Sequence, residues 1–194
     1  MFESKPNHRT PPGTATIGMW LFLAALTTLF GATLMGYAAI RLTSDRSPPL
    51  HTIHFPPSLW LSTAMMLAAS WTLHQALVNV RRERQEKVRQ FLLASAILAA
   101  GFVCVQIPSL YLLITEHFQK IHSGIFLYGL AFVLILVHAL HVVGGIIGLT
   151  TTVRHGMQGR YDHENYAGIK HAAMYWHFLD GVWIVMFLGM FFLG

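Results

Sequence analysis

The sequence predicts an all-α, polytopic membrane protein: a bundle of five transmembrane helices, with the N-terminus cytoplasmic and the C-terminus outside. Three observations lead to this prediction. First, 54% of the 194 residues are hydrophobic and only 11% are charged, whereas soluble domains carry about 25% charged residues. Second, long apolar stretches alternate with short polar joints. Third, the basic residues are concentrated in alternate joints. The length fits one compact bundle.

Five apolar stretches are each long enough to cross a bilayer core of about 30 Å, which takes about 20 helical residues. The predicted spans are residues 16–40, 57–80, 91–114, 124–153 and 168–193. Residues 1–15 are then a polar cytoplasmic tail, and residues 16–194 form one five-helix transmembrane domain. We do not expect a cleaved signal peptide, because the tail is longer than an n-region and the next apolar run is longer than an h-region.

The joints decide the orientation, because positively charged joints stay in the cytoplasm. Of the basic residues, only Arg41, Arg46 and Lys120 fall in joints on the side of the C-terminus. The run RRERQEKVR is typical of a cytoplasmic turn beside anionic lipid headgroups, so we predict no nucleic-acid partner. The basic residues on the side of the N-terminus are Lys5, Arg9, Arg81, Arg82, Arg84, Lys87, Arg89, Arg154, Arg160 and Lys170.

Several function classes are excluded by missing motifs. Cys104 is the single cysteine, which excludes a disulfide within the chain and a cysteine-rich metal site. The sequence also lacks the CxxCH haem-attachment motif, the Walker phosphate loop and the GxGxxG fingerprint.

Polar side chains recur inside the last two predicted spans. His177 and Asp180 are three residues apart and share a helix face, as do His138 and His141. All four lie at similar depth in the membrane. An aspartate in mid-membrane is unfavourable by about 2.5–3.5 kcal/mol, so it needs a partner. We therefore predict that these four residues form a buried, hydrogen-bonded cluster between the fourth and fifth spans.

Neighbouring residues support close helix packing around this cluster. Trp176 and Trp183 are seven residues apart and lie on nearly one stripe beside Asp180. Gly144 and Gly148 form a small-xxx-small pair, which lets another helix approach closely. We expect both features to belong to the interface between the last two helices.

Three interpretations of the polar cluster are open. The first is that the cluster fixes the register of the helices. The second is that it contacts lipid headgroups or buffers protons near neutral pH. The third is that it binds haem or a metal. The third is disfavoured, because His138 and His141 are too close along one helix to serve two separate haems. His74 also lies nearer the cytoplasmic end of its span. We favour the first and predict no catalytic, cofactor-binding or metal site in this chain.

Four segments resemble the haem–copper oxidase subunit III family. YWHFLDGVWIVMF resembles the YWHFVDVVW signature of that family's last helix, and HALHVVGGIIG resembles the HGLHVxxG segment of its preceding helix. GMWLFLAALTTLFG and WLSTAMMLAASWTLHQA are similar to two earlier helices. The match runs in order from about residue 17 to residue 194. The family signature residues found here are His138, His141, Trp176, His177, Asp180 and Trp183.

The resemblance implies a short, five-helix form that lacks the family's first two helices. It implies an accessory subunit of a proton-pumping oxidase of cytochrome c or quinol, not catalytic alone, in the bacterial cytoplasmic (inner) membrane. Its expected partners are the catalytic subunit I, the other oxidase subunits and phospholipid. Haem and copper are expected in the partner subunits and not in this chain.

The sequence departs from the family at positions where the family has carboxylates. Leu26 stands where a membrane-embedded glutamate is usual, and Lys170 stands where a glutamate commonly precedes the last signature. The acidic residue that the family often has shortly after the glutamine of the third span is missing after Gln106. Roles that need those carboxylates, such as a proton antenna, are therefore not expected.

Two other functions stay open. One is the related accessory protein of nitric oxide reductases, which shares the same helices. The other is a small b-type membrane cytochrome. The electron donor of the complex is also open, because donor sites belong to other subunits.

Overall fold

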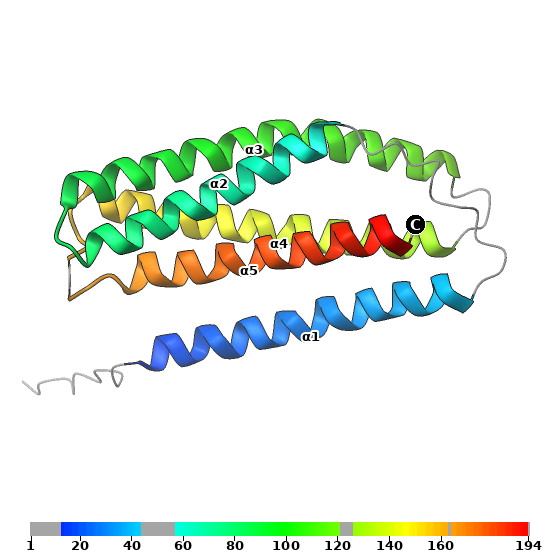
Figure 1. Cartoon of the computed structure of the whole chain (residues 1–194), viewed down its shortest axis with the longest axis horizontal. Helices are drawn as coiled ribbons and strands as arrows, with labels where there is room; N and C mark the ends of the chain where they lie inside the picture. The colour runs from blue at the N-terminus through cyan, green and yellow to red at the C-terminus, as the bar shows by residue number, and fades with distance from the viewer. Residues whose placement is uncertain (1–12, 44–56, 121–125, 163, 194) are drawn as a thin grey trace, which may run out of the picture.

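A computed structural model describes residues 13–43, 57–120, 126–162 and 164–193, and within these ranges the chain forms five long α-helices (Figure 1). The all-helical prediction is confirmed, and α2 has the predicted bounds. Helix α3 extends beyond the predicted span at both ends. The part of the predicted tail up to residue 12 lies outside the described residues. The helices are α1 (Thr14–Thr43), α2 (Pro57–Val80), α3 (Gln85–Lys120), α4 (Phe126–Met157) and α5 (Ala167–Leu193).

Helices α2 to α5 form a ring, and α1 lies outside it. Helix α2 contacts α3 and α5, α3 contacts α4, and α4 contacts α5, which closes the ring. Helix α1 runs along α4 and α5 (Figure 1). Helix α5 is therefore central, because it touches α1, α2 and α4 and can present a different face to each.

Four of the five described helices are long and apolar enough to cross a membrane. They are α1, the part of α3 up to Pro108, α4 from Phe132, and α5 up to Gly189. These four confirm that the chain is a multi-pass membrane protein. Helix α2 is of similar length but does not reach the same hydropathy. Its polar residues are Ser62, Thr63, Ser70, Thr72, His74, Gln75 and Asn79.

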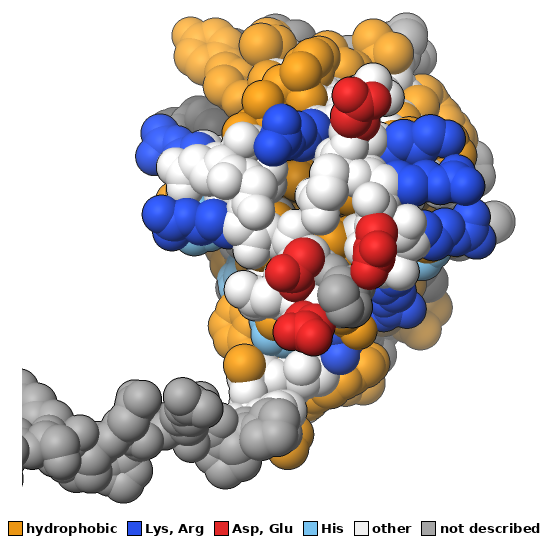
Figure 2. Space-filling view, turned by 90° about the vertical axis from the view of Figure 1, so that its left-hand side faces the viewer, with side chains coloured by type: hydrophobic (Ala, Val, Ile, Leu, Met, Phe, Trp, Pro, Cys, Tyr) orange, Lys and Arg blue, Asp and Glu red, His pale blue; other side chains and the backbone are white. Residues whose placement is uncertain are grey.

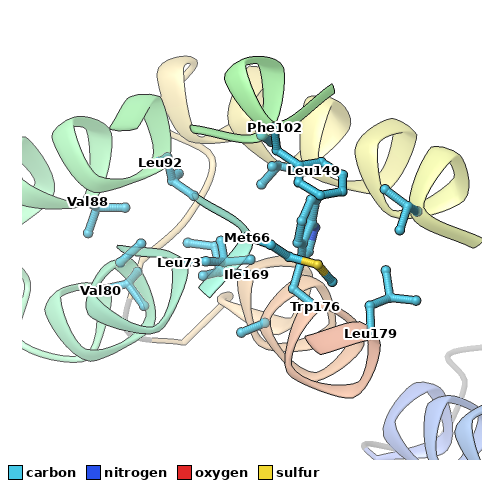
Figure 3. Packing of buried hydrophobic residues seen from close by; sticks show 14 of the residues in the cluster. Met66, Leu73, Val80, Val88, Leu92, Phe102, Leu149, Ile169, Trp176 and Leu179 are labelled. Carbon is cyan, nitrogen blue, oxygen red and sulfur yellow. The ribbon is translucent and has the colours of Figure 1, made fainter. Parts of the chain in front are cut away.

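The core of the ring is built around Trp176, which is only 1% exposed. Figure 3 shows its side chain among residues of the neighbouring helices. Lipid is as apolar as these side chains, so close van der Waals packing holds such a core together. Other buried members of this core are Met66, Leu73, Leu92, Phe102, Leu149, Ile169 and Leu179.

One end of the bundle is charged. Lysine, arginine and acidic side chains gather on the end that carries the α2–α3 turn and the α4–α5 loop (Figure 2). Gln85 Nε2 donates to the Tyr161 carbonyl over 2.9 Å, and the Arg81 guanidinium lies 5.1 Å from the centroid of the Tyr166 ring. A Cβ at Gly168 would overlap the Tyr161 side chain. These contacts join the turn and the loop.

Candidate functional site

A group of polar side chains, here called the polar seam, joins α2 to α5. It consists of Ser70, His74, His177 and Asp180. Ser70 Oγ and His177 Nδ1 are hydrogen-bonded at 2.7 Å, and the Ser70 hydroxyl lies near the Asp180 carboxyl. The ring centroids of His74 and His177 are 5.7 Å apart. His177 and Asp180 are three residues apart on α5, and Ser70 and His74 are four residues apart on α2, so each pair lies on one face of its helix. The bond between Ser70 and His177 shows that these two faces meet.

Asp180 is the acidic group of the seam and is buried, with 6% of its surface exposed. Its Oδ1 atom has no hydrogen-bond partner among the described residues. The Ser70 hydroxyl, one of the few polar groups near it, thus links a histidine and a carboxyl of α5 to α2. Such a hydroxyl fixes the register of two helices, because a one-residue shift would leave buried polar groups unpaired.

A second polar contact between α2 and α5 lies further along the helices. Trp183 Nε1 donates to Thr63 Oγ1 over 2.9 Å. The Trp183 ring stacks on the His138 ring of α4, with centroids 5.3 Å apart and planes at 27°. His138 is buried, and neither of its ring nitrogens has a partner within the described part of the chain. Trp183 therefore connects α2 to α4 through α5.

His141 lies on the other side of α5, near α1. Its Nδ1 donates to the Val137 carbonyl of the same helix over 2.7 Å. Tyr175 Oη donates to the His141 carbonyl over 2.9 Å, and the Phe30 ring of α1 meets the His141 ring edge-on at 5.4 Å. His141 thus helps to seat α1 against α4 and α5.

The structure differs from the predicted hydrogen-bonded cluster between the fourth and fifth spans. His177 bonds to Ser70 of α2, and His141 bonds within α4. His138 and Asp180 bond to neither of them. The reason is the central place of α5: the face with His177 and Asp180 turns towards α2, away from α4. The predicted similar depth of the four residues gave no information about which neighbouring helix each side chain faces. The missed partners, Ser70 and His74, stand four residues apart in SWTLHQA, and that spacing was the available signal.

The glycine of α4 that α5 approaches most closely is one residue away from the predicted pair, Gly144 and Gly148. A Cβ at Gly145 would lie 3.1 Å from side-chain atoms of both Leu179 and Tyr175, so α5 approaches most closely there. A Cβ at Gly144 would be 3.7 Å from Tyr175 Oη, and a Cβ at Gly148 would meet nothing within 4 Å. Gly148 therefore packs against none of the other described helices.

Gly144 and Gly148 instead line a groove between α1, α4 and α5 with a volume of about 410 Å³. Met19 and Phe22 contribute from α1, and His171 contributes a polar group from α5. Thr16 Oγ1 lies 3.2 Å from His171 Nε2, which joins α1 to α5 beside the groove. The groove is mostly apolar with a few polar groups, which suits an amphipathic molecule.

The metal-ligating residue types do not gather at one point. Among the residues that the structure describes, no three His, Cys, Asp or Glu side chains converge as metal ligands would. Leu26 lies in an apolar cluster with Phe30 and Tyr37, so the position where the family resemblance leads us to expect a carboxylate is filled by hydrocarbon.

The fold and the polar seam define a class of protein: a multi-pass helical membrane protein in which buried polar side chains bond one helix to the next. Comparison with known proteins specifies the family. The family model described as cytochrome c oxidase subunit III matches residues 14–194. The chain therefore belongs to the cytochrome c oxidase subunit III family, as the sequence motifs indicated.

Individual relatives agree with the family match. The cytochrome bo(3) ubiquinol oxidase subunit 3 of Pseudomonas putida is 29% identical, over 92% of this chain and 85% of its own length. The cytochrome c oxidase subunit 3 of Bacillus sp. (strain PS3) is 26% identical over the same shares. That of Bacillus subtilis (strain 168) is 26% identical over 100% of this chain and 93% of its own length.

Proposed function

We propose that the chain is an accessory, non-redox subunit III of a proton-pumping haem–copper terminal oxidase in a bacterial inner membrane. It lies beside the catalytic subunit I, stabilises it and contributes to oxygen reduction only within the complex. The haem and copper belong to the partner subunits. Family membership over residues 14–194 is the observation that carries this proposal.

The contacts of the polar side chains support a structural role. His177 is engaged with Ser70, and Trp183 is engaged with Thr63. Side chains held in this way fix helices in place. Leu26 supplies no carboxylate within the bundle, and Lys170 carries the opposite charge at its position. A proton-collecting role therefore receives no support from those two positions.

Orientation follows from the charged end of the bundle. Arginines of the α2–α3 turn and of the α4–α5 loop lie together there (Figure 2). Because basic residues are retained in the cytoplasm, we infer that this end, and with it the N-terminus, is cytoplasmic. Helix α2 then completes a fifth crossing and the C-terminus lies outside.

The groove between α1, α4 and α5 is the proposed phospholipid site. Its apolar walls fit an acyl chain, and the Thr152 and His171 side chains that line it offer polar contacts. Arg154, near the end of α4, provides positive charge for a headgroup phosphate. Replacing Gly148 with leucine should fill the groove without a clash in this chain, because a Cβ there meets nothing within 4 Å.

The lipid proposal is tested by native mass spectrometry of the intact complex. Gly148→Leu should lower the number of retained phospholipids, whereas Gly18→Leu on α1, also with open space around its Cβ, should not. Equal retention in both variants and in the unchanged protein would refute the proposal.

The proposed function itself is tested by mild-detergent purification of the tagged chain, followed by mass spectrometry and a visible spectrum. We expect the catalytic subunit of a haem–copper oxidase to co-purify, and we expect oxygen consumption to decline faster during turnover when the chain is deleted. Recovery of nitric oxide reductase subunits would support that alternative instead. A Soret band retained by this polypeptide alone would identify a b-type cytochrome.

A further inference from the structure

The outer face of α2 and α5, here called the α2/α5 face, combines apolar residues with two histidines. Leu67 and Trp71 are 43% and 58% exposed on α2, and Ile184 is 37% exposed on α5. His74 and His177 are exposed between them. The residues that define the face are Leu67, Trp71, His74, His177, Gly181 and Ile184.

His177 lies deep in the membrane, and the His74 ring lies beside it. His177 follows the start of α5, Ala167, by ten residues, which is a rise of about 15 Å into a hydrocarbon core of about 30 Å. Its Nδ1 is bonded to Ser70, so Nε2 is the atom that remains for an outside partner. His74 is in ring contact with His177 and has no hydrogen-bond partner in the described part of the chain. Acyl chains cannot satisfy either imidazole.

The composition of α2 points the same way. Among the five described helices, α2 is the one that does not reach the hydropathy of the other four. It nevertheless lies in the ring beside α3 and α5. A helix with polar side chains at lipid depth normally turns them towards protein or a water-filled cavity. The exposed side of α2 therefore needs a cover that can form hydrogen bonds.

Helix α1 provides the contrast within the same molecule. Its exposed side chains include Trp20, Leu21 and Met35, with 62%, 68% and 67% of their surfaces exposed. Its exposed threonines bond to carbonyls of their own helix, as Thr28 does to Ala25. The Trp20 indole N–H stands six residues after the start of α1 at Thr14, where it can reach the headgroup layer, and acyl chains can cover the rest of this surface. Lipid is therefore a sufficient neighbour for α1 and an insufficient one for the α2/α5 face.

We propose that the α2/α5 face docks a transmembrane helix of a different oxidase subunit, and that this helix presents a hydrogen-bonding side chain to His74 and His177. The inference rests on the proposed function, which supplies the complex. A second copy of this chain is the competing occupant, and the cross-linking experiment below distinguishes the two. Gly181, whose Cβ position meets nothing within 4 Å, leaves room for the partner helix to approach.

Photo-cross-linking in native membranes tests the proposal without disturbing the fold. A benzophenone amino acid is placed at Leu67 or Ile184 on the face, and at Leu21 or Leu29 on α1 as the matched controls. We expect the face positions to form adducts with another oxidase subunit at least five times more efficiently than the α1 positions. Adducts of the face positions with lipid alone, or with a second copy of this chain, would overturn it.

A blocking substitution gives an independent test in the assembled oxidase. Gly181→Leu places a bulky side chain on the face, and we expect at least a tenfold loss of co-purifying oxidase subunits at an unchanged amount of the chain in the membrane. Gly18→Leu on α1 is the matched control and should retain them, because its Cβ position is equally open. Full retention in Gly181→Leu would refute the docking site.

The substitution His74→Leu distinguishes a face that is covered by protein from a face that is covered by lipid. If lipid covers the face, His74→Leu removes an unsatisfied group, and subunit retention stays the same. If a subunit covers it, we expect retention to fall about fivefold, because its hydrogen-bonding partner is left unpaired. Should the unchanged chain fail to co-purify with any oxidase subunit, the proposed function fails. Should it co-purify while Gly181→Leu and His74→Leu do so equally, only the docking face is wrong.

Discussion

Helices α1 and α2 are attached to α5 in different ways. Helix α2 is joined by side-chain hydrogen bonds, Ser70 with His177 and Thr63 with Trp183. Helix α1 is joined mainly by contacts between aromatic rings, among them Phe22 stacked on Tyr175 with centroids 6.0 Å apart. The difference shows that one bundle uses two kinds of interface: a polar one where helix register is specified, and an apolar one where a neighbour is held by shape alone.

The two interfaces respond differently to the membrane. Between helices in lipid there is no hydrophobic driving force, so association depends on packing and hydrogen bonds. The ring formed by α2 to α5 has both. Helix α1 packs mainly through one small cluster around Phe30 and Tyr37. We therefore expect α1 to separate from the ring at a lower free energy than the ring needs to open.

The largest expected effect is the loss of the ring's central side chain. Trp176→Ala should destabilise the protein by about 3 kcal/mol, because it leaves a large cavity in the core. Trp20→Ala on the exposed side of α1 should cost less than about 0.5 kcal/mol. Thermal denaturation in the same detergent compares the two variants. Equal melting temperatures would show that the ring does not depend on its core packing.

The next effect concerns the carboxyl at the polar seam. Asp180→Leu places a larger side chain in the packed contact between α5 and α2 and should cost about 1–3 kcal/mol, which is the usual cost of overpacking. Asp180→Asn keeps the shape and an acceptor oxygen, so it should cost less than half as much. Chemical denaturation in mixed micelles measures both variants. Two variants as stable as the parent protein would show that the site tolerates a larger side chain and that the carboxyl has no structural task.

The sequence predicted the helices well and their relative rotation poorly. Length and hydropathy locate a helix, because crossing a bilayer requires about 20 apolar residues. The ends of α2 and α5 were accordingly found to within a residue. Hydropathy says little about which side of α5 faces which neighbour, however, since apolar residues surround the helix. His177 was therefore assigned to the wrong partner helix.

Pairs within one helix were easier to predict than pairs between helices. The three-residue spacing of His177 and Asp180 predicts that both lie on one face, because that inference needs helix geometry alone. The pairing of Trp183 with Thr63 joins residues 120 positions apart, and local spacing carries no information on such a pair. Which glycine of α4 lies closest to α5 depends likewise on the orientation of Tyr175 and Leu179, and that glycine is Gly145.

A third substitution compares the two kinds of interface through a single hydroxyl. Thr63→Val removes the acceptor of the Trp183 indole hydrogen and should cost about 1 kcal/mol, within the range for hydrogen bonds between membrane helices. Thr28→Val is the matched control, because its exposed hydroxyl bonds only to the Ala25 carbonyl of its own helix. It should be nearly neutral. A larger loss from Thr28→Val than from Thr63→Val would reverse the comparison between α1 and α2. Chemical denaturation of both variants in the same mixed micelles gives the measurement.

The smallest expected effect is at the polar contact between α1 and α5. Thr16 Oγ1 and His171 Nε2 are 3.2 Å apart, at the long end of hydrogen-bond distances. Thr16→Val should therefore cost about 0.5 kcal/mol, close to the mean for such bonds in membranes. The loss should fall on α1 alone, which hydrogen exchange of backbone amides can localise: faster exchange in α1 with unchanged exchange in α2 and α5. Faster exchange throughout the ring would mean that α1 is a full member of the cooperative core, and the distinction between the two interfaces would then be wrong.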